Sequence, residues 1–76
     1  MKRSVATAIR PLDVVALTVD HPDRGLVRGQ VGTVVELLGP DAYEVEFCDD
    51  AGRSYAQLAL PGEQLMVLRY EPAAAE

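Results

Sequence analysis

The alternation of apolar and polar residues predicts a chain built from short β-strands. The clearest case is the stretch Ala42–Cys48, in which aromatic or apolar residues alternate with two glutamates. Successive side chains of a strand point to opposite faces of its sheet, so this stretch has one face for the core and one for solvent. No part of the chain repeats apolar residues at i, i+3, i+4 and i+7 over several turns, so the pattern does not predict helices.

A second strand is predicted from Val31 to Leu38, directly after a turn that contains two glycines. Gly29 and Gly32 allow backbone conformations with positive φ that other residues resist, so we predict a sharp structural turn here. The residues that follow, Thr33-Val34-Val35, are β-branched without a break and favour a pleated, half-buried surface. The turn therefore leads into the central strand of the sheet.

Three further segments have strand character and are separated by turn-forming residues. In the first of them, Val15, Leu17 and Val19 share one face by the period of two. The loop after it is rich in turn formers, and Leu26 is predicted to tuck beneath this loop as a plug. The expected bounds are 13–19 for the first strand, 53–58 and 65–69 for the last two, and 60–64 for a helical or 3₁₀ turn between these two.

Five short strands, with a long loop after the first and a tight turn before the last, predict an all-β fold. We expect a small five-stranded SH3-like antiparallel barrel with a short 3₁₀ turn before its last strand. The barrel should span residues 11–70, between a flexible N-terminal arm at 1–10 and a frayed C-terminal tail at 71–76. The predicted core draws on apolar residues from all strands, namely Val15, Leu17, Leu26, Val34, Val45, Phe47, Ala56, Leu58 and Leu65.

Composition narrows the class of protein and of partner. The chain has 76 residues, which is one domain, and its 49% hydrophobic content is typical of a globular fold. Seven Lys and Arg residues against twelve Asp and Glu residues give a net charge of −5, which disfavours nucleic acid and anionic lipid and favours a basic partner. With a single cysteine, no signal peptide and no membrane-spanning run, we expect a cytoplasmic protein that does not contact the membrane.

The residue types needed for catalysis are present but are not grouped. His21 is the only histidine, and the sequence places no serine or cysteine nucleophile beside it. Cys48 precedes Asp49 and Asp50, whose negative charges should raise the pKa of its thiol and so disfavour a reactive thiolate. We therefore predict no catalytic residues, no metal site and no cofactor.

The polar face of the predicted sheet carries the candidate binding residues. If the hairpin closes over residues 49–52, Glu46 lies opposite Tyr55 and Glu44 lies opposite Gln57. Together with Glu36 on the neighbouring strand, this arrangement makes an acidic stripe with an aromatic ring at its edge. Two interpretations stay open: ordinary solvated face residues, or a surface that binds a partner and relieves the repulsion of like charges.

Two sequence patterns resemble known families. The motif Arg28-Gly29-x-x-Gly32-x-Val34-x-x-Leu37 resembles the KOW motif of ribosomal and transcription-elongation SH3-like barrels, with Arg28 in the usual lysine place. This resemblance implies a module on the ribosome or a polymerase that touches RNA through the glycine turn. A longer and more specific pattern runs through Leu12-Asp13-Val14-Val15-Ala16-Leu17, Gly25-Leu26, Arg28-Gly29-x-x-Gly32-Thr33-Val34-Val35-Glu36, Tyr43-Glu44-Val45-Glu46-Phe47, Gly52-Arg53 and Leu65.

This longer pattern covers about residues 12–68 and resembles a family of small bacterial proteins, domain of unknown function 4926. The family brings no established activity or catalytic residues to carry over. Members encoded beside small toxin-like proteins imply an antitoxin or immunity role. We therefore expect a non-enzymatic module that binds a basic protein through Glu36, Glu44, Glu46 and Tyr55; the alternative is the KOW-like RNA-binding module.

Overall fold

The computed structural model describes residues 9–72, which form β-strands and short 3₁₀ turns. The prediction of an all-β fold with five antiparallel strands, and with a 3₁₀ turn before the last of them, is confirmed. No helix within residues 9–72 is long and apolar enough to cross a membrane. Most of the arm predicted at 1–10 and of the tail predicted at 71–76 lies outside the described residues. The elements are β1 (Val14–Leu17), η2 (Pro22–Arg24), β2 (Val31–Gly39), β3 (Ala42–Cys48), β4 (Ser54–Pro61), η3 (Gly62–Gln64) and β5 (Leu65–Val67).

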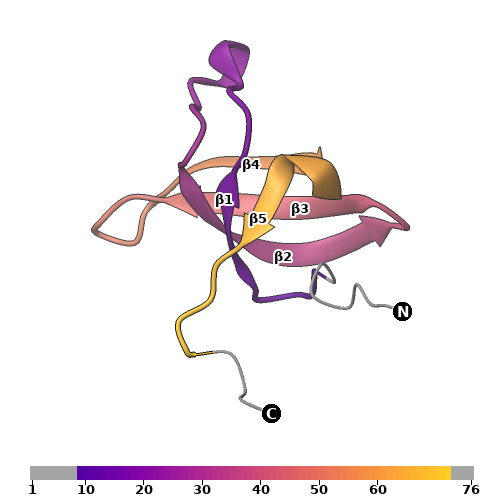
Figure 1. Cartoon of the computed structure of the whole chain (residues 1–76). Coiled ribbons are helices and arrows are strands. Elements are labelled where there is room, and N and C mark those ends of the chain that lie inside the picture. The colour runs from indigo at the N-terminus through magenta and orange to yellow at the C-terminus, as the bar shows by residue number, and fades with distance from the viewer. Residues whose placement is uncertain (1–8, 73–76) are drawn as a thin grey trace, which may run out of the picture.

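All five strands belong to one sheet, in the order β4-β3-β2-β1-β5, and every neighbouring pair is antiparallel. Figure 1 shows β1 running across the direction of β3 and β4, with β2 curving from one direction to the other. Two register irregularities between β2 and β3, at Val34/Glu36 and Leu37/Gly39, accompany this curve, because an extra residue bends a strand and increases its twist. The sheet thus rolls around its apolar face, although no hydrogen bonds within the described residues join β4 to β5 and close it.

The apolar face of the rolled sheet forms a single core. Every residue that the sequence predicted for the core is buried in it, except that Ala56 is partly buried and packs against it. Ile9, Tyr43 and Val67 also pack against the core from its margin. The buried cluster consists of Val15, Leu17, Leu26, Val34, Val45, Phe47, Leu58, Leu60 and Leu65.

The first strand is shorter than predicted, and Val19 does not face the core. β1 ends at Leu17, and Val19 is 38% exposed. From Thr18 onward the chain leaves the sheet, and the Thr18 N–H donates instead to the carbonyl oxygen of Gln64 in η3 at 2.9 Å. Leu26, which returns from the loop, is 1% exposed, so its predicted role as the plug is confirmed.

Leu60 belongs to β4 and to the core, whereas the sequence predicted it for the turn that follows. It pairs with Tyr43 of β3 and is 2% exposed. Pro61 indicated an earlier end to the strand, because proline donates no ladder hydrogen bond. However, β4 is an edge strand, so a residue there can do without a donor, and the turn begins only at Gly62.

Candidate functional site

Gly29 and Gly32 are both needed at the start of β2, but for different physical reasons. Gly29 has a φ of +95° and its N–H donates to the carbonyl oxygen of Leu17 at 2.8 Å, so the predicted positive-φ turn is confirmed there. Gly32 does not have a positive φ, so for this residue the prediction is wrong. A Cβ at Gly32 would lie 2.9 Å from the carbonyl oxygen of Glu46 and 2.9 Å from Cδ2 of Phe47. Gly32 therefore allows β3 to approach closely.

Three glutamates share the outward face of β2 and β3, and we call Glu36, Glu44 and Glu46 the acidic face. Glu36 pairs directly with Glu44, and Glu46 pairs with Thr33. Val45, between the two glutamates of β3, is fully buried, so the glutamates on either side of it point away from the core. The structure thus brings together the three carboxylates that the sequence placed on one stripe.

The predicted register between β3 and β4 is wrong by two residues. Glu46 pairs with Gln57 rather than with Tyr55, and Glu44 pairs with Ala59 rather than with Gln57. Part of the shift arises in the hairpin, since β4 begins one residue later than expected. The rest arises from an irregularity at the end of β3, where β4 carries an extra residue.

Tyr55 is the extra residue at this irregularity, and its contacts are with the turn before β2 and with the core. Its hydroxyl accepts a hydrogen bond from Nε2 of Gln30 at 2.9 Å, and its ring centroid lies 6.4 Å from that of Phe47 at an angle of 41°. The side chain is 49% exposed. Within residues 9–72 it has no hydrogen bond to Glu44 or Glu46, so the ring is held in place independently of the acidic face.

The acidic face is short of compensating charge. Glu44 accepts a hydrogen bond from Nε2 of Gln57 at 3.0 Å. The sequence predicted that these two residues lie opposite each other, and their side chains do meet on the outward face, although the backbone of Glu44 pairs with Ala59. No ion pair joins the acidic face to a cation within residues 9–72. Because like charges on directly paired positions repel, Glu36 and Glu44 favour a positive group from outside.

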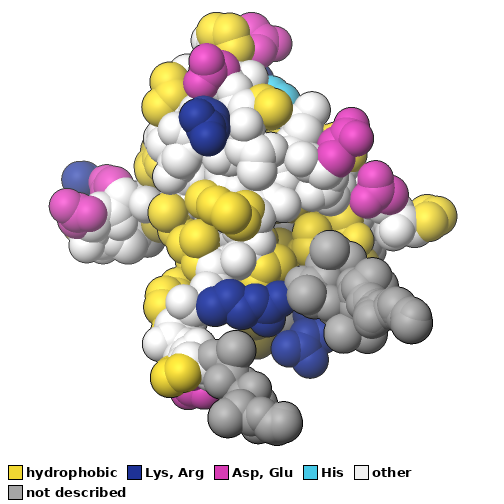
Figure 2. All heavy atoms as spheres, in the orientation of Figure 1, with side chains coloured by type: hydrophobic (Ala, Val, Ile, Leu, Met, Phe, Trp, Pro, Cys, Tyr) yellow, Lys and Arg dark blue, Asp and Glu magenta, His cyan; other side chains and the backbone are white. Residues whose placement is uncertain are grey.

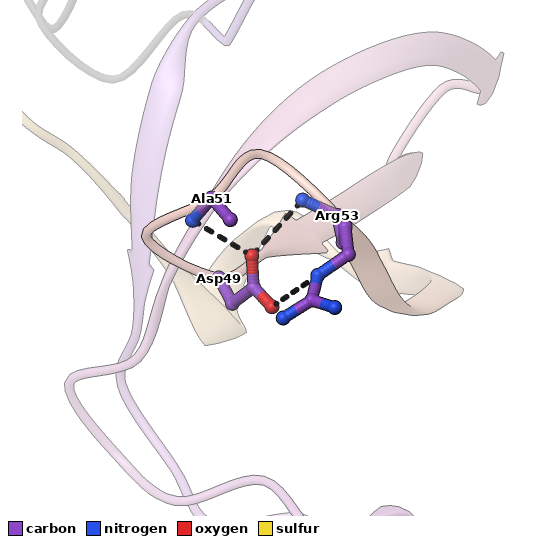
Figure 3. Close-up of polar contacts among 3 residues, drawn as sticks. All are labelled: Asp49, Ala51 and Arg53. Atoms are coloured by element: carbon purple, nitrogen blue, oxygen red, sulfur yellow. Dashed lines mark hydrogen bonds and ion pairs between the residues drawn. The ribbon is translucent and has the colours of Figure 1, made fainter.

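Arg53 is the first basic residue after Glu46 along the chain. It forms an ion pair within the β3–β4 hairpin (Figure 3). Its Nε lies 3.2 Å from Oδ2 of Asp49. The other carboxylate oxygen of Asp49 accepts hydrogen bonds from the N–H groups of Ala51 at 2.9 Å and Arg53 at 3.0 Å. Asp49 therefore organises the hairpin, and Arg53 pairs there rather than with the acidic face.

His21 and Cys48 are the two side chains best suited by type to nucleophilic chemistry, and they lie in different parts of the fold. Nε2 of His21 lies 2.8 Å from Oε1 of Gln64, so the ring ties the loop after β1 to η3. At Cys48, partial loss of solvent around the sulfur and the charges of Glu46 and Asp49 raise the pKa of the thiol above its ordinary value. Within residues 9–72, no three His, Cys, Asp or Glu side chains are grouped so that they could hold a metal ion.

Comparison with known proteins identifies the family of the chain. A family model described as Domain of unknown function (DUF4926) matches residues 12–67, a range that contains β1 to β5 and the acidic face. No curated protein and no solved structure matches the chain significantly. Because the family model covers well over half of the sequence, the chain belongs to the DUF4926 family.

Proposed function

We propose that this chain is a non-enzymatic, cytoplasmic protein-binding module whose acidic face receives a basic protein. The observation that carries this proposal is the acidic face itself: three carboxylates on paired strands, with no cation bound to them within residues 9–72. A partner's basic groups would replace repulsion by attraction, and the sheet already holds the carboxylates in position. The net charge of −5 adds attraction at longer range.

The partner we propose is a small basic protein, held in an antitoxin- or immunity-type complex. Tyr55 is the aromatic residue that serves this interface best. It lies two residues before Gln57, which pairs with Glu46, and about half of its side chain is exposed. Tyrosine combines apolar area with a hydroxyl group, and for this reason it often dominates the binding energy of interfaces.

A charge-reversal experiment tests the acidic face. The Glu44→Lys/Glu46→Lys variant, used as bait in extracts of the native cell, should recover much less of the partner that the wild-type protein captures. The physical reason is that reversal turns attraction into repulsion at the contact itself. Recovery is measured as the ratio of partner to bait in the eluate.

The matched control is Asp23→Lys/Asp50→Lys, which changes the net charge equally but in η2 and in the β3–β4 hairpin. Both aspartates are exposed. This control should recover the partner almost as well as the wild-type protein. Equal recovery of the partner by the acidic-face variant and by the wild-type protein would contradict the proposal, provided that circular dichroism shows both proteins to be folded.

The KOW-like alternative would use Arg28 and the Gly29 turn to contact RNA. The loop around this turn carries Asp20 and Asp23 as well as Arg24 and Arg28, so its charges balance. In addition, the Arg28 N–H donates to Oδ1 of Asp20 at 2.8 Å, which places a carboxylate at the turn itself. A surface for phosphates needs a clear excess of positive charge.

We therefore expect binding to single- or double-stranded RNA or DNA to be no tighter than the weak non-specific range, about 10⁻⁴ M at physiological salt. Fluorescence anisotropy with labelled oligonucleotides measures this affinity. Micromolar binding that weakens steeply with added salt would favour the KOW-like function over the proposed one.

A further inference from the structure

A cavity of about 550 Å³ opens between the β2–β3 hairpin, η3 and β5. Its inner wall is apolar and includes Ile9, Tyr43, Leu65 and Val67, which also pack in or against the core. In Figure 2, hydrophobic surface lies below acidic side chains at the right of the molecule, where Figure 1 places η3 and the start of β3. A cavity of this volume lies within the usual range for small-ligand pockets, roughly 300–1,000 Å³.

Two exposed carboxylates belong to the lining of this cavity. Oδ1 of Asp41 accepts a hydrogen bond from the N–H of Gly62 at 3.1 Å, which holds the β2–β3 hairpin against η3. The Glu63 side chain has no hydrogen bond or ion pair within residues 9–72. Arg69 also lines the cavity, so the lining residues within 9–72 carry two carboxylates and one guanidinium group, a negative balance.

We propose that this cavity binds the side chain of a lysine or arginine presented by a peptide or protein. The aliphatic stem would pack on the apolar wall, and the cationic head would meet Asp41 and Glu63. Lysine and arginine suit such a site because their stems bury on apolar surface while their charged ends stay near water. An anionic side chain would be repelled, and a purely apolar one would offer no positive charge to Asp41 and Glu63.

The cavity is separate from the acidic face. Tyr43 lines the cavity and packs against the core, whereas its neighbour Glu44 points to the opposite side of β3. This inference therefore goes beyond the function proposed above and does not depend on it. A partner that bound both the cavity and the acidic face would have to present basic groups to two sides of the same sheet.

The experiment is a titration of the ¹⁵N-labelled protein, followed by ¹H–¹⁵N correlation spectra. The probes are acetyl-Gly-Lys-Gly-amide, its arginine counterpart, and the matched peptides with norleucine or glutamate in the centre. Lysine and arginine peptides should give saturable shifts at the amides of Tyr43, Gly62 and Val67. The norleucine peptide, which keeps the stem and lacks the charge, should bind about three- to tenfold more weakly, and the glutamate peptide should not bind.

The Asp41→Asn/Glu63→Gln variant removes both charges while asparagine keeps an acceptor for the Gly62 N–H. This variant should bind the lysine peptide more weakly by the same factor and should bind the norleucine peptide as tightly as the wild-type protein does. The control Asp23→Asn/Asp50→Asn should bind both peptides with unchanged affinity. Absence of saturable shifts at the cavity amides, or equal binding of the glutamate peptide, would overturn the inference. Shifts confined to the amides of the acidic face would also overturn it, while leaving the proposed function standing.

Discussion

Replacing Phe47 with alanine should lower the free energy of unfolding by about 3–5 kcal/mol. Phe47 is the largest of the fully buried side chains and is 0% exposed. Its removal takes away the transfer free energy of an aromatic ring and leaves a cavity that the two neighbouring strands cannot fill without moving. A domain of this size has a total stability of about 5–10 kcal/mol, so the variant should be close to unfolding at room temperature.

Urea denaturation followed by circular dichroism measures this effect. The matched control is Tyr70→Ala, because Tyr70 is an aromatic residue that lies exposed after β5. The control should change the free energy of unfolding by less than about 0.5 kcal/mol. An unchanged denaturation midpoint for Phe47→Ala would remove this residue from the core and with it the assignment of the inward face of β3.

Replacing Gly32 with valine should destabilise the fold by about 1–3 kcal/mol or more. A Cβ at this position would lie 2.7 Å from Cγ1 of Val45 and 2.9 Å from the carbonyl oxygen of Glu46. The second of these atoms is backbone, so relief requires β2 and β3 to move apart. Such a shift would disturb the ladder that supports the acidic face.

Asparagine substitutions separate crowding from backbone strain. Asparagine adopts positive φ more readily than other residues with a Cβ, so Gly29→Asn should be milder than Gly29→Val. At Gly32 the Cβ itself would collide with β3, so Gly32→Asn should destabilise the fold almost as much as Gly32→Val. Thermal melts of the four variants measure the difference. A Gly32→Val variant as stable as the wild-type protein would contradict the close approach of the two strands.

Local patterns in the sequence predict most of the fold correctly. The alternation in β3 identified Val45 and Phe47 as core residues and the glutamates between and beside them as outward-facing, because each strand residue obeys the same period. Leu26 was recognisable as a plug, since it is an apolar residue in a loop of turn formers. These inferences need only a residue and its immediate neighbours.

The errors concern features that depend on two distant segments together. Tyr55 departs from the predicted register because a bulge opposite Phe47 leaves no trace in the periodicity of either strand. Position 32 requires glycine because β3 approaches it closely. In the sequence, a glycine required by such an approach looks the same as a glycine required by a turn. The cavity beside Asp41 and Glu63 joins a hairpin to a turn some twenty residues away, so neither segment alone indicates it.

A partner could also bind without using the acidic face. β4 is an edge strand, so a partner strand could extend the sheet along it through main-chain hydrogen bonds. In that arrangement the outward side chains of β3 would contribute little. The two modes of binding differ in their association kinetics, because charges on a face steer a partner from a distance whereas strand pairing forms only after contact.

The association rate constant of the captured partner, measured by surface plasmon resonance at low and physiological salt, tests the acidic face most directly. The Glu44→Lys/Glu46→Lys variant should associate about tenfold more slowly than the wild-type protein at low salt. The association rate of the control, Asp23→Lys/Asp50→Lys, should be much closer to that of the wild-type protein. Tyr55→Ala should mainly speed dissociation. Equal association rates for the wild-type protein and both charge variants, or equal slowing by the two variants, would contradict binding through the acidic face.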